Sequence, residues 1–145
     1  MQILINLHSY LAYVVLAMLV IAVVNAVIGL AGKKMFTLER DFRISLFALI
    51  ISHIQLLIGL LVYFLSPNGL QAIRNLGMGG LTASARLLAL EHPIINILAI
   101  ALITIGWSRH KKFLEGNLKF RSIALFYGLG LLLLLSRIPW ALWFN

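Results

Sequence analysis

Four long apolar runs, separated by shorter polar segments, dominate the pattern of this chain. They cover residues 3–30, 44–65, 94–107 and 122–144. Three of the runs exceed the roughly 20 residues that a helix needs to cross the hydrocarbon core of a bilayer. The pattern therefore predicts an all-α integral membrane protein, with one domain over residues 1–145 folded as an up-down bundle of four transmembrane helices.

The third run is too short on its own, because residues 94–107 rise only about 21 Å as a helix. One interpretation starts the helix near residue 87, which places Glu91, His92 and Pro93 in the membrane. The alternative begins a short helix at Pro93, whose missing N–H costs nothing at the first helical position. We prefer the longer helix over residues 87–107, because lipid does not tolerate exposed irregular backbone.

The basic residues indicate which loops face the cytoplasm. Nine of the twelve Lys and Arg residues lie in segments 33–43 and 109–121, which join helix 1 to helix 2 and helix 3 to helix 4. Cytoplasmic loops retain Lys and Arg, so both segments are expected inside and both termini outside. The link over residues 66–85 is then external, with one turn of surface helix expected around residues 71–76.

Composition supports the membrane class. Of the 145 residues, 62% are hydrophobic and 11% are charged, and the mean hydropathy is +1.03. A soluble domain of this size could not bury so much apolar surface, which excludes a soluble enzyme. The absence of Cys excludes a disulfide scaffold, thiolate catalysis and iron–sulfur ligation. The net charge of +8 does not indicate nucleic-acid binding, because the aromatic residues lie in the spans rather than among the basic residues.

Every predicted span contains at least one ionisable side chain, which is costly in lipid and marks a candidate functional residue. These residues are His8, His53, Glu91, His92 and Arg137. Hydrogen bonding across close-packed helix seams explains small and polar residues well, but it explains imidazoles on three separate helices poorly. His110 belongs to a basic loop, and we expect it in water.

A bound haem explains the histidines best. Histidine is the usual axial ligand of haem iron, and four-helix bundles hold cofactors between facing helices. No Cys-x-x-Cys-His sequence is present, so we expect non-covalent haem b. Asn96 shares the helix face of His92. Arg137 or Arg86 is the expected partner of a haem propionate. A zinc or di-iron carboxylate site is not expected, because Glu91 is the only acid in a span.

Two of the three histidines would bind the iron, and the sequence leaves the pair open. Counted from the cytoplasmic helix ends, His53 lies about 15 Å up, His92 about 22 Å and His8 about 33 Å. Height therefore favours His53 with His92. The width of a haem favours His8 with His92. Neighbouring helices lie only about 8–10 Å apart, so a haem fits more easily between diagonal helices, and helices 1 and 3 are diagonal in an up-down bundle. His92 belongs to both pairs.

Several short motifs resemble those of small bacterial four-helix membrane proteins labelled "cytochrome B", and the similarity covers most of the chain. The motifs are Leu7-His8-Ser9, His53-Ile54-Gln55-Leu56-Leu57-Ile58-Gly59, Ser66-Pro67, Glu91-His92-Pro93 and Arg137-Ile138-Pro139-Trp140. The Glu-His-Pro helix is also faintly similar to half of a haem A synthase bundle. The resemblance implies haem b and electron transfer, with His8, His53 and His92 as candidate ligands.

We therefore expect an electron carrier of the bacterial inner membrane rather than a stand-alone enzyme. It would bind one haem b and pass single electrons, with a quinol or a partner subunit as donor or acceptor, and it could form homo-oligomers. One alternative is a small proton-coupled transporter or channel that uses Glu91, His92, Asn96 and Arg137 as a polar path. The other is a non-catalytic subunit for assembly of a membrane complex.

Overall fold

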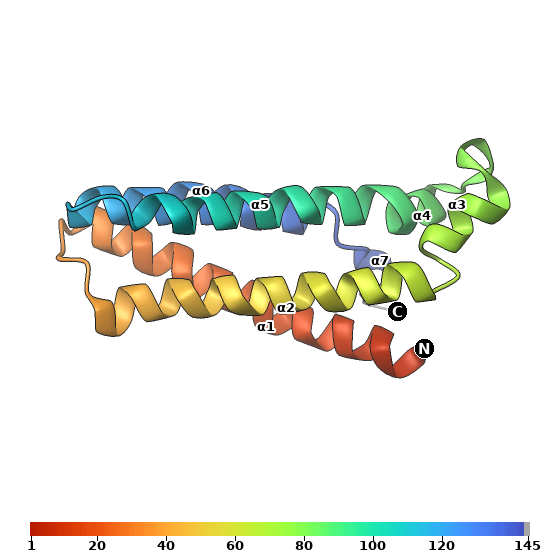
Figure 1. Cartoon of the computed structure of the whole chain (residues 1–145), viewed down its shortest axis with the longest axis horizontal. Coiled ribbons are helices and arrows are strands. Elements are labelled where there is room, and N and C mark those ends of the chain that lie inside the picture. The colour runs from red at the N-terminus through yellow and green to blue at the C-terminus, as the bar shows by residue number, and fades with distance from the viewer. Residues whose placement is uncertain (144–145) are drawn as a thin grey trace.

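The computed structural model describes residues 1–143, which form helices and connecting segments without strands. Four long helices run antiparallel in chain order (Figure 1). They are α1 (Gln2–Ala31), α2 (Arg43–Leu65), α5 (His92–His110) and α6 (Gly116–Ser136). The shorter elements are η1 (Leu38–Phe42), α3 (Leu70–Leu76), η2 (Met78–Gly80), α4 (Ala83–Arg86), η3 (Leu87–Glu91) and α7 (Trp140–Trp143). The prediction of an all-α chain with four long apolar helices is confirmed.

Two helix boundaries bear on the candidate residues. The elements α4, η3 and α5 form one helical segment over Ala83–His110, so His92 and Pro93 lie inside a helix. In contrast, α6 ends at Ser136, whereas the sequence predicts a helix to residue 144. The residue before Pro139 is restricted to extended conformations, and the chain turns there before α7. Residue 144 lies outside the described residues.

The four long helices pack as a ring. Helices α1 and α5 each contact both α2 and α6, so α1 lies diagonal to α5. The start of α1 and the short helix α7 lie at one end of the bundle, which we name the terminal end (Figure 1). The opposite end, which holds η1 and the α5–α6 connection, is named the loop end. The two corresponding halves of the bundle are the terminal half and the loop half.

The loop half and the middle of the bundle are closely packed. Glycines bring α5 and α6 together: a Cβ on Gly130 would lie 2.7 Å from Cγ1 of Ile103, and one on Gly106 would lie 2.5 Å from Cβ of Phe126. Small residues allow such close approach of membrane helices. Large side chains fill the space behind this seam without exposure to solvent, namely Leu19, Ile103, Phe120, Ile123 and Tyr127.

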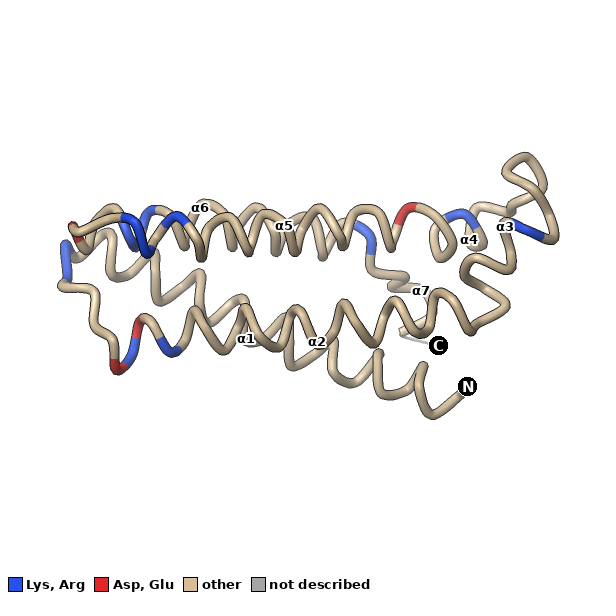
Figure 2. Tube along the Cα trace, in the orientation of Figure 1, with Lys and Arg blue, Asp and Glu red and all other residues tan. Residues whose placement is uncertain are grey.

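The outer surface of the bundle is apolar between its two ends. Large side chains such as Leu57 and Leu132 are more than 60% exposed. Figure 2 shows that the charged residues gather at the ends and leave the middle of the long helices without charge. Four helices are therefore long and apolar enough to cross a membrane.

The prediction that His110 lies in water is wrong. His110 is the last residue of α5 and is only 1% exposed. Its Nδ1 lies 2.6 Å from the carbonyl oxygen of Trp107, and its ring packs against Phe36 and Phe42. The sequence places His110 among basic residues, but α5 extends further than predicted and the α1–α2 connection folds over it.

Candidate functional site

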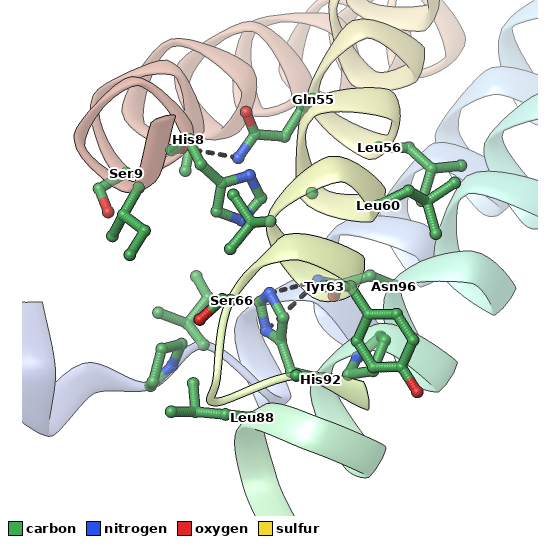
Figure 3. Close-up of a pocket in the computed structure, with 18 of the residues that line it drawn as sticks. His8, Ser9, Gln55, Leu56, Leu60, Tyr63, Ser66, Leu88, His92 and Asn96 are labelled. Carbon is green, nitrogen blue, oxygen red and sulfur yellow. Dashed lines mark hydrogen bonds between the residues drawn. The ribbon is translucent and has the colours of Figure 1, made fainter. Parts of the chain in front are cut away.

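A cavity of about 380 Å³ lies in the terminal half of the bundle (Figure 3). All four long helices and α7 contribute to its wall. Small side chains leave space on the α1 and α2 sides, at Ser9, Ala12, Ser52 and Gly59. The volume lies within the range of about 300–1,000 Å³ that small-molecule sites occupy. The terminal half therefore has room between its long helices, whereas the pocket at the loop end lies among the connecting segments, within residues 33–36 and 114–119.

Two of the three candidate histidines reach into this cavity (Figure 3). The ring centroids of His8 on α1 and His92 on α5 are 6.1 Å apart, and the ring planes lie at 84°. Two imidazoles bound to opposite sides of one metal ion, at about 2.0–2.1 Å each, place their ring centroids roughly 6–6.5 Å apart. The spacing of His8 and His92 agrees with that value. The structure thus brings together the diagonal pair.

Helix α2 determines where the imidazole of His8 can lie. A Cβ on Gly59 would lie 2.9 Å from Cε1 of His8, so the absence of a side chain makes room for the ring. One turn earlier, Nε2 of Gln55 donates a hydrogen bond of 2.8 Å to the backbone carbonyl of His8. Sequence reasoning missed Gln55 as a site residue, although it is the only side-chain amide in the second apolar run.

His92 is oriented by a backbone carbonyl. Its Nδ1 lies 2.8 Å from the carbonyl oxygen of Arg137, which can only accept a hydrogen bond. Nδ1 therefore carries the proton, and Nε2 of a neutral ring keeps its lone pair. The amide nitrogen of Asn96 lies 3.0 Å from that Nε2. This arrangement is typical of metal-binding histidines, whose second nitrogen usually donates to a carbonyl or carboxylate.

Three buried polar atoms around the cavity have no hydrogen-bond partner among the described residues. They are Nδ1 of His8, Oε1 of Gln55 and Oδ1 of Asn96. All three side chains line the same cavity. A buried polar group without a partner costs free energy, so a bound molecule or ordered water that contacts these atoms would stabilise the site.

A widened turn precedes His92. Pro93 has no N–H to donate to Ala89, and the backbone N–H of His92 instead bonds to the carbonyl of Leu87, five residues earlier. Such a π-helical turn contains an extra residue and changes the phase of the helix on either side of it. Turns of this kind are frequent at functional sites. Pro93 therefore directly follows a local change of helical register.

His53 does not line the cavity. Its Nδ1 lies 2.8 Å from the carbonyl oxygen of Leu49, and its Nε2 lies 3.3 Å from the hydroxyl of Thr104 on α5. Both ring nitrogens thus have partners in the protein. His53 links α2 to α5, which is the cross-helix hydrogen bonding that membrane bundles use for packing.

Glu91 forms ion pairs with Arg86 and Arg137, the two arginines expected from the sequence to pair with a haem propionate. Nε of Arg86 lies 3.1 Å from Oε1 of Glu91, and Nε of Arg137 lies 3.3 Å from Oε2. None of the three residues lines the cavity. The prediction that Arg86 or Arg137 pairs with a propionate stays a prediction.

Within residues 1–143, no group of three or more His, Cys, Asp or Glu side chains is placed to hold a metal ion. The cavity offers two imidazoles and neutral polar groups instead. No family model, curated protein or solved structure matches this chain. The geometry of the cavity is therefore the basis on which a function can be proposed.

Proposed function

We propose that the chain is a membrane-embedded b-type cytochrome that holds one haem b between His8 and His92 and carries single electrons. The observation that supports this most strongly is the separation of 6.1 Å between two imidazoles on diagonal helices, across a cavity. Bis-histidine ligation of haem requires such a pair on facing helices.

The residues present fit this group. The Nδ1–H of His92 is bound by a carbonyl, so Nε2 is the nitrogen that carries the lone pair, and iron would take the place of the Asn96 amide at Nε2. Nδ1 of His8 is buried and has no hydrogen-bond partner among the described residues, so the His8 ring is available to a bound ligand. The small residues at the wall provide space beside both rings.

Haem b supplies one-electron redox chemistry when it is bound. The chain contributes ligand orientation and an apolar wall. Leu56, Leu60 and Leu134 line the cavity and limit the access of water, which influences the reduction potential of a metal site. A quinol or a redox partner subunit is the proposed source or acceptor of the electron.

The proposed membrane orientation follows from the charges. The loop end carries nine Lys and Arg residues, and we place it on the cytoplasmic side. The terminal end then faces outward, with four crossings of a bacterial inner membrane between the two. The haem would lie toward the outer half of the bilayer.

The core of the loop half favours this function over a transporter or channel. A polar path would have to cross the whole bundle, but the fully buried side chains there include Leu19, Ile103 and Ile123. Glu91 and Arg137, which such a path would use, are bound to each other. An assembly subunit would have no need of an internal cavity with unpartnered polar atoms.

Optical spectroscopy tests the proposal. The chain is expressed in haem-replete cells and purified in mild detergent, and a reduced-minus-oxidised spectrum is recorded. We expect Soret and α bands of haem b and about one haem per chain. His8→Ala and His92→Ala should each lose the haem, because each removes an axial ligand.

His53→Ala and His110→Ala are the matched controls and should keep the haem bands. Circular dichroism of every variant checks that the helices are retained. A colourless wild-type protein despite adequate haem would end the cytochrome proposal. If the His53 variant lost the haem and the His8 variant kept it fully, His53 rather than His8 would be the partner of His92.

A further inference from the structure

We infer that Glu91 and Arg137 are positioning residues for His92. In this arrangement the Glu91 carboxylate holds Arg137, and the Arg137 backbone carbonyl holds the imidazole of His92. The inference rests on the proposed function, because it assigns the two residues to the orientation of an axial ligand. It also gives Arg137 a role other than contact with a propionate.

The first contact joins α5 to the end of α6. Nδ1 of His92 lies 2.8 Å from the carbonyl oxygen of Arg137, 45 residues away in the chain. Arg137 directly follows the last residue of α6 and has φ −129° and ψ 21°. Its carbonyl has left the helical conformation and is free to accept a hydrogen bond from a side chain.

The second contact joins Arg137, at the end of α6, to Glu91 of η3. Nε of Arg137 lies 3.3 Å from Oε2 of Glu91, the residue directly before His92. This ion pair joins the Arg137 side chain to another segment, whereas its Nη1 bonds to the neighbouring carbonyl of Ser136. The two contacts close a ring through Glu91, His92 and Arg137. Loss of the ion pair would therefore free the carbonyl that orients His92.

Arg86 provides an internal comparison. Its Nε lies 3.1 Å from Oε1 of the same carboxylate, but its backbone makes no hydrogen bond with His92. Removal of either arginine takes the same charge away from Glu91. Only removal of Arg137 disturbs the residue whose carbonyl contacts the imidazole. Comparison of the two substitutions thus separates a loss of His92 positioning from a loss of positive charge beside Glu91.

A hydrogen bond to Nδ1–H fixes the tautomer of a ligating histidine and raises the basicity of its other nitrogen. Changes to such outer partners typically weaken metal affinity by about 10- to 100-fold. We therefore expect Glu91→Gln and Arg137→Gln each to weaken haem affinity by about tenfold or more. Arg137→Lys keeps a cation for Glu91 and should recover part of that loss.

The experiment titrates haem b into haem-free protein in detergent and follows the Soret band of each variant. Arg86→Gln should show a clearly smaller loss of affinity than Arg137→Gln. Arg74→Gln, in the exposed helix α3, should equal the wild type. A second readout is ¹⁵N NMR of the His92 ring in haem-free protein, assigned with His92→Ala. The Nδ1–H tautomer should dominate in the wild type and lose population in Glu91→Gln and Arg137→Gln.

Equal effects of Arg86→Gln and Arg137→Gln would overturn the inference, because charge alone would then explain them. Wild-type haem affinity and an unchanged His92 tautomer in Glu91→Gln would also overturn it. Failure of the wild type to take up haem would instead contradict the proposed function. The NMR readout does not depend on haem, so the two failures are distinguishable.

Discussion

The two halves of the bundle differ in whether their buried polar groups have hydrogen-bond partners. In the loop half, Asp41 is fully buried and accepts hydrogen bonds from Asn25 and Thr37, and the hydroxyl of Tyr127 donates to the carbonyl of Ser45. In the terminal half, His8, Gln55 and Asn96 each have a buried polar atom without a hydrogen-bond partner in the described part of the chain. The same four helices thus form a satisfied core at one end and an unsatisfied cavity at the other. This contrast supports the proposal that the cavity holds a ligand.

Helix geometry explains where the cavity forms. In Figure 1 the first part of α1 lies apart from α5 and α6, and α7 lies near it at the terminal end. Trp143 of α7 stacks on Tyr13 of α1, with ring centroids 4.4 Å apart. The divergence of α1 leaves space that the side chains do not fill. Because α1 carries His8, the same divergence places one proposed ligand at the cavity wall.

The largest effect on stability is expected at the seam between α5 and α6. A Cβ on Gly130 would lie 2.7 Å from Cγ1 of Ile103 and 3.0 Å from the carbonyl oxygen of Ala99. Gly130→Ala should therefore force α5 and α6 apart and destabilise the fold by about 1–3 kcal/mol. Thermal unfolding in detergent measures the change.

Gly128→Ala is the matched control for this prediction. It lies on the same helix two residues earlier, and a Cβ there would meet nothing within 4 Å. It should unfold at or slightly above the wild-type temperature, because Ala favours helix over Gly. Equal destabilisation by the two substitutions would contradict the view that the α5–α6 seam is closely packed.

A smaller effect, on binding rather than stability, is expected in the terminal half. A Cβ on Gly59 would lie 2.9 Å from the edge of the His8 ring, and that ring borders a cavity into which it can shift. Gly59→Ala should therefore change the unfolding temperature little but misplace His8. We expect haem affinity to fall roughly tenfold, as it does when ligand orientation is disturbed. A haem titration beside Gly128→Ala checks this, and an unchanged affinity would show that the ring is not constrained by α2.

The sequence predicts the four helices well, because runs of apolar residues carry that information directly. It also predicts that Asn96 lies near His92, since the two residues are one turn apart. It cannot choose between His8 and His53, because helix tilt changes the height of a residue by several ångströms. The partners of His53, Leu49 and Thr104, depend on side-chain rotamers and on the rotation of α2 against α5.

Two further features depend on contacts between distant segments. His110 is buried because the α1–α2 connection brings Phe36 and Phe42 over it, which no local pattern indicates. The link from His92 to Arg137 spans the α5–α6 hairpin and depends on where α6 ends. Charge and hydropathy predict that Arg137 is unusual in a span. They do not predict that its backbone carbonyl is the atom that contacts His92.

The most direct test of the central claim is electron paramagnetic resonance of the oxidised, haem-loaded protein. Axial ligation by His8 and His92 predicts a low-spin ferric signal, strongly anisotropic because the imidazole planes lie at 84°. The His53→Ala variant should give the same signal, and the His8→Ala variant should lose it. A high-spin signal in the wild type, or a low-spin signal that survives His8→Ala, would contradict the account.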